Sequence, residues 1–570
     1  MVFQAVPGWT KSVVLRIRPY CRLGAVRNTS LHPFADEGQH QLLTRISWQK
    51  GLTRPANSLG GNFYRLIRYR FQSGNSWQAG WLMESDAGES VRRSGPDFIS
   101  AYVNWKRTGG RLNWLLGDYS VQMGQGLICW QGMTFGPGTD LPAIKRQGVS
   151  VRPYQSVGEG RFLRGVAVSA STRKVSWDVF ISRNPQTAPR YSLLDGRVGF
   201  RQVDVSGYHR TAMELAKKDR LIEYTAGGRM GSRFHGGRWN INWIGRCWSI
   251  PQFFIGDLRR VDTSWQVFRS NASADVSFTR GSLHAFGEMA VDARGRLASV
   301  LGAVVVLDRR VDWSIHLRWI GNAFRSVDGQ AFQHASTGTS ERGGYTQLRF
   351  RINDRQLLDV YSDMYFLPRP GFFSSTPSFG LIQGGRWQYQ PDKRNLLYLR
   401  FQWARSDRDD DARPLPRTSI HTSRSLRLHG QFDLGAKQSL SVRAEKIMIV
   451  AKEGPDDETG FLAYLEWKKE PEKSGVGLDV RLLWVSTDGW ASRIYAYERD
   501  VLYKAGFPAF FGKQLRGYLN ASAPIGQRAM IWVHLFVDKK IDYHWGTDFV
   551  SPIEPGATVQ FRYQWDVGRR

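Results

Sequence analysis

Single arginines recur on the polar side of alternating segments, and they are the residues of this sequence best suited to gathering anions. Arg318, Arg400 and Arg562 are the clearest cases. The same placement is repeated at Arg349, Arg351, Arg427 and Arg443. The formal net charge is +29 at pH 7, and a charge of that size attracts nucleic acid, lipid phosphate or acidic substrates. An ordinary solvated basic surface is the competing interpretation.

Two segments, residues 117–154 and 206–228, break the alternation and hold a second set of candidates. Their candidate ligand residues are Asp118, Gln122, Gln125, Tyr208, His209, Arg210 and Thr211. Side chains of these types can bind an anion or a solute, or they can fasten an inserted loop inside a barrel by hydrogen bonds. The fastening interpretation is favoured for His209. A helical pattern is expected over residues 212–220, with Glu214 placed before Lys218.

The remaining chemistry-bearing residues form no recognisable catalytic or metal motif. The acidic run from Asp407 to Asp411 offers oxygen ligands that calcium can use, but interspersed arginines favour a solvated loop. Cys21, Cys129 and Cys247 lie too far apart for a metal-ligand or redox spacing. No nucleophile motif, phosphate loop or zinc-binding helix is found in the sequence. We therefore expect no enzyme activity, no cofactor and no metal site.

The elements that must position these residues are β-strands with one apolar and one polar face. On both sides of the turn at Gly435–Lys437, apolar and polar side chains alternate with a period of two. The unit recurs along the chain and predicts roughly 22 to 26 strands of about 9 to 11 residues. Strands are expected at residues 40–49, 62–72, 77–85 and 98–106.

The connections between these strands fall into two classes. Some are tight, as at residues 279–282 and 435–437, and others are long and polar, as at residues 322–343 and 405–419. Short turns at one end and long loops at the other are typical of an outer-membrane barrel. No apolar run approaches the roughly 18 residues that a membrane-spanning helix needs. Residues 25–570 are therefore predicted to form a large antiparallel transmembrane β-barrel in contact with outer-membrane lipid.

The first 24 residues predict a separate, partial module. A Pro-Gly step is followed by a short helical pattern that Thr10 can cap. This resembles the second half of a helix-hairpin-helix module, which holds a nucleic-acid phosphate on backbone N–H groups. The nucleic-acid-binding candidates are Pro7, Gly8, Thr10 and Lys11. A bare connector to upstream sequence is the favoured alternative.

Longer motifs carry a resemblance to a known family. They are Glu84–Glu89, Gly117–Leu127, Arg152–Tyr154 and Ser206–Thr211. From about Val6 onward, the chain resembles the outer-membrane β-barrels of Gram-negative bacteria that carry helix-hairpin-helix domains. The resemblance implies a signal peptide and further helical hairpins upstream, so Met1 is expected to lie inside a longer reading frame. The alternating aromatics near the C-terminus resemble the closing strand that the barrel-assembly machinery reads.

The expected function is to bind or pass a solute or polymer across the outer membrane, with polyanions, DNA among them, favoured. Acidic residues on the same polar faces, such as Glu288, Asp312 and Glu445, limit the expected charge preference to a moderate one. One alternative is a secreted, soluble all-β enzyme or binding protein for an acidic polysaccharide. Another is a structural or assembly role in the outer membrane. The oligomeric state is left open.

Overall fold

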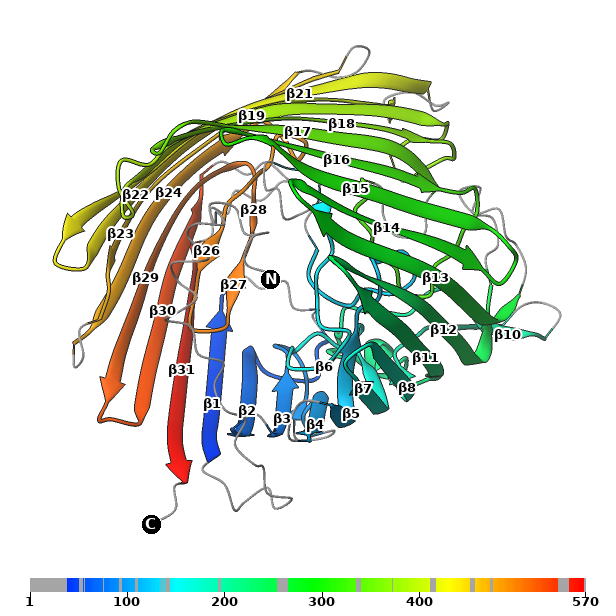
Figure 1. Ribbon diagram of the computed structural model, residues 1–570. Coiled ribbons are helices and arrows are strands. Elements are labelled where there is room, and N and C mark those ends of the chain that lie inside the picture. Colours follow the sequence, from blue (N-terminus) through cyan, green and yellow to red (C-terminus); the bar gives the residue numbers. More distant parts are fainter. Residues whose placement is uncertain are drawn as a thin grey trace.

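Twenty-four antiparallel strands form one sheet whose last strand pairs with its first, so the computed structural model is a closed barrel (Figure 1). At the seam, Gly38 lies opposite Val567 and Gln49 lies opposite Gly556. The structure describes residues 38–567 except 51–54, 56, 75, 92–94, 108–110, 135, 137, 139–143, 193–195, 254–264, 335–339, 372, 411–416, 452–456, 472–474 and 542–552. The nucleic-acid candidates Pro7, Gly8, Thr10 and Lys11 lie outside the described residues.

The strands of the barrel wall are β1 (Gly38–Gln49), β2 (Phe63–Ser73), β3 (Trp77–Ser85), β4 (Phe98–Lys106), β5 (Leu112–Val121), β7 (Leu163–Ser171), β8 (Val175–Gln186), β11 (Leu221–Phe234), β12 (Gly237–Gln252), β13 (Gln266–Arg280), β14 (Leu283–Asp292), β15 (Leu297–Asp308), β16 (Val311–Ile320), β17 (Glu341–Asn353), β18 (Gln356–Leu367), β19 (Ser378–Tyr389), β20 (Leu396–Asp410), β21 (Arg417–Gly435), β22 (Gln438–Ala451), β23 (Glu458–Lys469), β24 (Gly477–Thr487), β29 (Lys513–Ile525), β30 (Ala529–Lys540) and β31 (Ile553–Val567). The short elements between them are β6 (Val151–Pro153), β9 (Arg190–Ser192), β10 (Val198–Phe200), α3 (Ala212–Leu215), β25 (Ile494–Tyr495), β26 (Glu498–Arg499), β27 (Ala505–Gly506) and β28 (Ala509–Phe510).

The strand count lies within the predicted range, and β3 and β4 have the bounds that the alternation predicts. The lengths differ from the prediction, because wall strands run from 9 residues in β3 to 19 in β21. The expected long loop at 405–419 is wrong. β20 and β21 continue through most of it, where Asp407 accepts the N–H of Phe379 and Asp409 that of Ser375. Asp411 lies outside the described residues.

The two ends of the barrel differ in the length of their connections. At the end where β1 begins and β31 finishes, two to seven residues join successive strands. In one of the two-residue turns, between β21 and β22, Ala436 and Lys437 both have positive φ, as a type I′ hairpin requires. At the opposite end, which we call the long-loop end, the connections include residues 86–97, 122–162, 187–220 and 488–512.

The outside of the barrel is apolar and carries aromatic residues at both of its edges. Leu426, Leu428 and Phe401 are among the large side chains exposed there. Tryptophans near the short-turn edge are Trp77, Trp105, Trp114, Trp177, Trp239, Trp313, Trp387, Trp467 and Trp565, and those near the long-loop edge are Trp48, Trp319, Trp403 and Trp484. Aromatic belts around an apolar band are characteristic of transmembrane barrels. The soluble alternative is wrong, because a single closed sheet leaves these apolar side chains with no second sheet to cover them.

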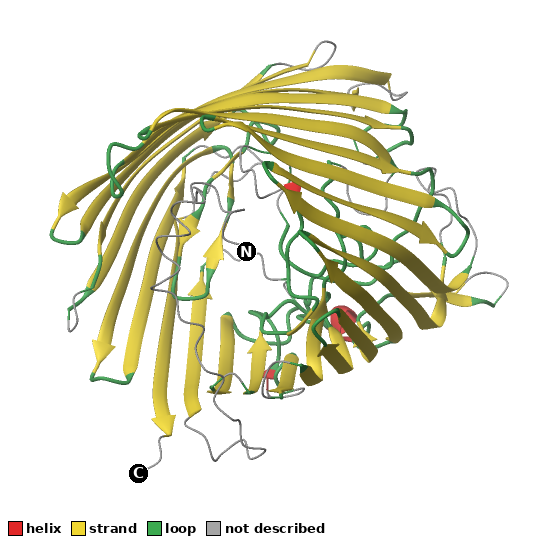
Figure 2. Ribbon diagram, viewed as in Figure 1, coloured by secondary structure: helices red, strands yellow, loops and turns green. Residues whose placement is uncertain are grey.

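Among the described residues, helix is almost absent (Figure 2). Within the described residues, none of the helices has the length and the apolar character that a membrane crossing requires. The helix expected over 212–220 is reduced to the single turn α3, where Glu214 pairs with Arg210, and Lys218 pairs with Asp97 instead of Glu214. Residues 221–228, expected in an insertion, belong to wall strand β11.

Candidate functional site

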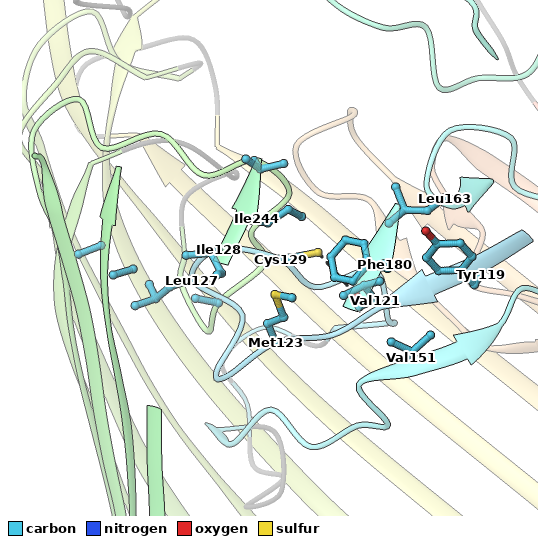
Figure 3. Packing of buried hydrophobic residues seen from close by; sticks show 14 of the residues in the cluster. Tyr119, Val121, Met123, Leu127, Ile128, Cys129, Val151, Leu163, Phe180 and Ile244 are labelled. Carbon is cyan, nitrogen blue, oxygen red and sulfur yellow. Dashed lines mark hydrogen bonds between the residues drawn. The ribbon is translucent and has the colours of Figure 1, made fainter. Parts of the chain in front are cut away.

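The lumen contains a folded part of the chain, residues 122–153, which we call the first inserted segment (Figure 1). Its apolar residues, among them Met123, Leu127, Ile128 and Cys129, pack with wall residues into the largest apolar cluster of the described chain (Figure 3). The cluster also takes in Ile244, Ala290, Val300 and Phe324. The segment is therefore held by an apolar core on the inner face of the barrel wall, where the sequence predicted polar side chains.

One wall carboxylate anchors the turn of this segment. The Oε2 atom of Glu288 accepts the backbone N–H of Gln125 at 2.7 Å and that of Leu127 at 3.0 Å. Gly124, directly before Gln125, lies against that carboxylate: its φ is +54°, and a Cβ there would lie 2.5 Å from the Glu288 side chain. The Gly-rich sequence is thus explained by a close approach of backbone to a buried carboxylate.

A second inserted segment, residues 488–512, enters the lumen with the small sheets β25–β28 (Figure 1). Wall arginines hold it by its carbonyl oxygens: Arg443 donates to Tyr495 O, Arg481 to Tyr497 O and Arg45 to Leu502 O. Arg68 also lies over the ring of Tyr503, 4.6 Å from its centroid. The sequence did not predict this insertion, because its residues show neither a motif nor a long polar run.

At the long-loop end, two connections meet around His209, in what we call the His209 cluster. His209 Nδ1 lies 2.6 Å from Asp97 Oδ2, and its Nε2 lies 2.9 Å from Thr187 Oγ1. The backbone N–H of His209 donates to Glu89 at 2.9 Å, and Lys218 Nζ donates to Asp97 Oδ1 at 2.8 Å. These contacts tie residues 86–97 to residues 187–220.

The chemistry of the His209 cluster favours fastening over anion binding, because carboxylates surround the ring. Glu89, Asp97 and His209 bring one potential ligand atom each within 4.8 Å of one another, a donor set that a divalent cation can use. The same atoms are already engaged by Thr187, Lys218 and backbone N–H groups. Burial alone would raise the pKa of Asp97, but the hydrogen bonds from His209 and Lys218 outweigh it and lower that pKa.

The His209 cluster should loosen as the pH rises. Burial raises the pKa of Glu89 to about 7 and that of Glu159 to about 8, and the nearby Asp97 carboxylate adds to both shifts. A folded-state pKa above the unfolded value of about 4.5 means that the folded state binds more protons, so stability falls as pH rises from about 4.5 through 8. Hydrogen exchange of peptides from residues 86–91 and 204–218 should be faster at pH 8.5 than at pH 6, after correction for intrinsic rates.

The matched variant for this pH effect is Glu159→Gln, which removes one of the two titrating groups. We expect its peptides to show a smaller pH dependence than the wild-type peptides. Lys218 and Asp86 also lie near Glu159, with opposite effects on its carboxylate. Protection that increases with pH would contradict the assignment.

The other candidates in the two irregular segments also form internal contacts. Asp118 is buried in β5 and pairs with Arg164 at 2.7 Å. Gln125 Oε1 accepts the backbone N–H of Arg146, and Gln122 forms an isolated antiparallel β-bridge with Trp130. Thr211 caps α3 in a reciprocal capping box with Glu214, Arg210 pairs with Glu214 at 3.0 Å, and the exposed Tyr208 ring lies under Arg210. The structure thus brings Tyr208, His209, Arg210 and Thr211 together in the connection 187–220, apart from the arginines of the wall strands.

A row of charged residues crosses the lumen face of seven neighbouring strands at one register level. In order from β16 to β22, it consists of Asp312, Arg349, Asp359, Arg386, Arg400, Arg427 and Glu445. Arg349 pairs with Asp359 at 2.6 Å, Arg386 with Asp359 at 3.2 Å, and Arg427 with Glu445 at 2.9 Å. We call its central part, Arg386, Arg400 and Arg427, the arginine triad.

Arg400 is the member of the triad without an acidic partner among the described residues. Its guanidinium donates to the neutral Gln402 side chain, and its Nε is buried without a hydrogen bond in the described structure. It lies directly opposite Arg386 on one side and Arg427 on the other. Like charges directly opposite one another on neighbouring strands are unfavourable. An anion between them would offset this repulsion.

The other two arginines chosen from the sequence have different surroundings. Arg318 faces inward, but its side chain is 0% exposed and pairs with Glu341 and, at 2.7 Å, with Asp363. Arg562 also faces the lumen, where it lies 5.3 Å from the centroid of the Trp532 ring and contacts Met530 Sδ. Arg318 is therefore part of a buried ion-pair network on the inner face of the wall.

The comparisons with known proteins show no family for this chain. No protein-family model and no curated protein matches the chain. Among solved structures, the ferric enterobactin receptor PfeA from Pseudomonas aeruginosa matches with 7% identity and a TM-score of 0.46 over 93% of this chain and 81% of that one. The siderophore receptor PirA from Acinetobacter baumannii gives 7% and 0.44 over 93% and 81%, and the copper transporter OprC gives 7% and 0.43 over 93% and 83%.

Proposed function

We propose that this outer-membrane barrel binds an anionic solute at the arginine triad and passes it through the lumen. The observation that carries the proposal is the position of Arg400, which lies between Arg386 and Arg427 and has only neutral side-chain partners, Gln402 and Tyr361, in the described structure. Three guanidinium groups in one row present many N–H donors in the geometry that carboxylate and phosphate oxygens prefer.

The charge of the surrounding row supports a moderate preference for anions. Four arginines face three carboxylates along the row, so one positive charge is left over, and it falls at the triad. Charges in a confined lumen are screened less than charges on an open surface. Rings of charged side chains of this kind set the ion selectivity of pores. The proposal covers a small anionic solute, since the nucleic-acid candidates lie outside the described residues.

Replacing Arg400 by Gln should weaken anion binding and anion preference without unfolding the barrel. Gln is acceptable on a wet face, and it removes the charge that the triad leaves uncompensated. The protein in detergent should bind tripolyphosphate at low salt about fivefold more weakly after the change, as expected for one charge near a polyanion. In a planar bilayer under a KCl gradient, the reversal potential of the variant should move toward that of an unselective pore.

The control is Arg310→Gln, which removes one positive charge from an exposed turn at the short-turn end and leaves the lumen unchanged. It should bind tripolyphosphate like the wild type. A cation-selective wild-type pore, or equal tripolyphosphate binding by wild type and Arg400→Gln, would refute the proposal.

A further inference from the structure

The lipid-facing surface of the barrel has a hollow over strands β17 to β20. Its volume is about 750 Å³, within the roughly 300–1,000 Å³ of typical small-molecule sites. The side chains that line it include Leu348, Val360, Trp387, Leu399, Phe401 and Trp403. Val360, Leu399 and Phe401 are each at least 40% exposed, so this hollow opens toward lipid and not toward the lumen.

The hollow arises from the register of these strands. Val360, Gly385 and Phe401 lie in one row, and the missing side chain of Gly385 leaves a depression between two large neighbours. The next row toward the long-loop end contains Ser362, Gln383 and Trp403. The depression is thus apolar along the strands and becomes polar at the level of the aromatic belt.

Three cations lie beside that polar end, on the same outer face. Arg405 follows Trp403 by two residues on β20, Arg424 lies opposite Trp403 on β21, and Lys446 is a diagonal neighbour of Arg424 on β22. Diagonal neighbours of this kind are about 7–8 Å apart, within reach of one headgroup for such long side chains. We call Arg405, Arg424 and Lys446 the outer basic cluster.

The outer basic cluster has no charge partner within the described part of the chain. Arg424 and Lys446 make no hydrogen bond or ion pair there, and Arg405 Nε is buried without a partner. The nearest carboxylate on this face, Asp407, accepts the N–H of Phe379. Three cations at the edge of an apolar belt are costly unless an anion meets them, and the headgroup phosphate of a lipid lies at that level.

We propose that the hollow and the outer basic cluster form one binding site for an anionic phospholipid, with an acyl chain in the hollow and the phosphate on Arg405, Arg424 and Lys446. The two features are adjacent, because Trp403 lines the hollow and lies directly opposite Arg424. A protein partner would have to match both an apolar groove and a charge cluster at lipid depth. An anionic phospholipid matches both features, because its acyl chain fits the apolar groove and its phosphate fits the charge cluster. The site is independent of the solute proposed for the lumen.

Native mass spectrometry can test the site on the purified barrel. The protein is released from micelles that contain equal amounts of phosphatidylglycerol and phosphatidylcholine with the same acyl chains. The wild type should retain one phosphatidylglycerol in clear excess over phosphatidylcholine. Arg405→Gln together with Arg424→Gln should lower retained phosphatidylglycerol by about twenty-five-fold, about fivefold for each charge removed near a membrane surface.

The matched control is Arg65→Gln together with Lys539→Gln, which removes two outward cations from β2 and β30, away from the hollow. It should retain phosphatidylglycerol like the wild type. Gly385→Leu should fill the hollow and lower retention of both lipids, while heat-dependent gel migration verifies that each variant is folded. Equal retention of the two lipids by the wild type, an equal loss in the control, or full retention by Arg405→Gln/Arg424→Gln would overturn the proposal.

Discussion

Replacing Arg318 by Met should lower the free energy of unfolding by about 3–5 kcal/mol, the usual cost of breaking a buried ion pair on one side. Glu341 and Asp363 would then lose the cation that both share, in a place where both side chains are 0% exposed. Urea unfolding in detergent micelles, followed by the change of gel migration, would measure the loss.

The control for this experiment is the triple change Arg318→Met, Glu341→Gln and Asp363→Asn. If uncompensated charge causes the loss, the triple variant should recover most of the stability, since neutral groups of similar shape can replace a buried ion pair at little cost. A triple variant as unstable as Arg318→Met would show that packing, not charge, is the cause.

Replacing Glu288 by Ala should release the turn of the first inserted segment and open the lumen. The carboxylate accepts two backbone N–H groups, and hydrogen bonds to a charged group contribute about 1.5–3 kcal/mol each. A loss of about 3 kcal/mol changes a local opening equilibrium by roughly a hundredfold. Hydrogen exchange of residues 122–131 should accelerate accordingly, and the single-channel conductance in a planar bilayer should rise.

Asp178→Asn provides the comparison for Glu288→Ala. Asp178 is also a buried wall carboxylate, and it pairs with Arg229 without touching the first inserted segment. It should leave the exchange of residues 122–131 and the conductance unchanged. If both variants conduct alike, the effect would come from the charge of the lumen and not from the position of the segment.

The fold could be predicted from the sequence because its rules are local. The period of two assigns each side chain to one face, and turn residues mark where strands end, so β3 and β4 have the expected bounds. The long loop expected at 405–419 is wrong because β20 and β21 go on pairing above the headgroup level, where alternating polar residues remain in a hydrogen-bonded ladder. Local pattern does not reveal where the bilayer ends.

The candidate site was less predictable, because it depends on register between strands. The sequence places Arg318 and Arg400 on the same polar face, and nothing in either neighbourhood distinguishes them. Only pairing across strands shows that Arg318 shares two carboxylates while Arg400 lies between two arginines. Arg386 was missed for the same reason. His209 and Asp97 are 112 residues apart, so their contact had no local signal.

The seam between β1 and β31 has a consequence for how the barrel is made. Gly38 and Val567 pair across nearly the whole described chain, and this ladder is the longest-range contact of the fold. Until it forms, two strand edges carry unpaired N–H and C=O groups, which hydrocarbon does not tolerate. Every partial barrel therefore has two open edges, whatever its number of strands. We expect insertion into lipid to be completed in one cooperative step, the pairing of β1 with β31 along the seam.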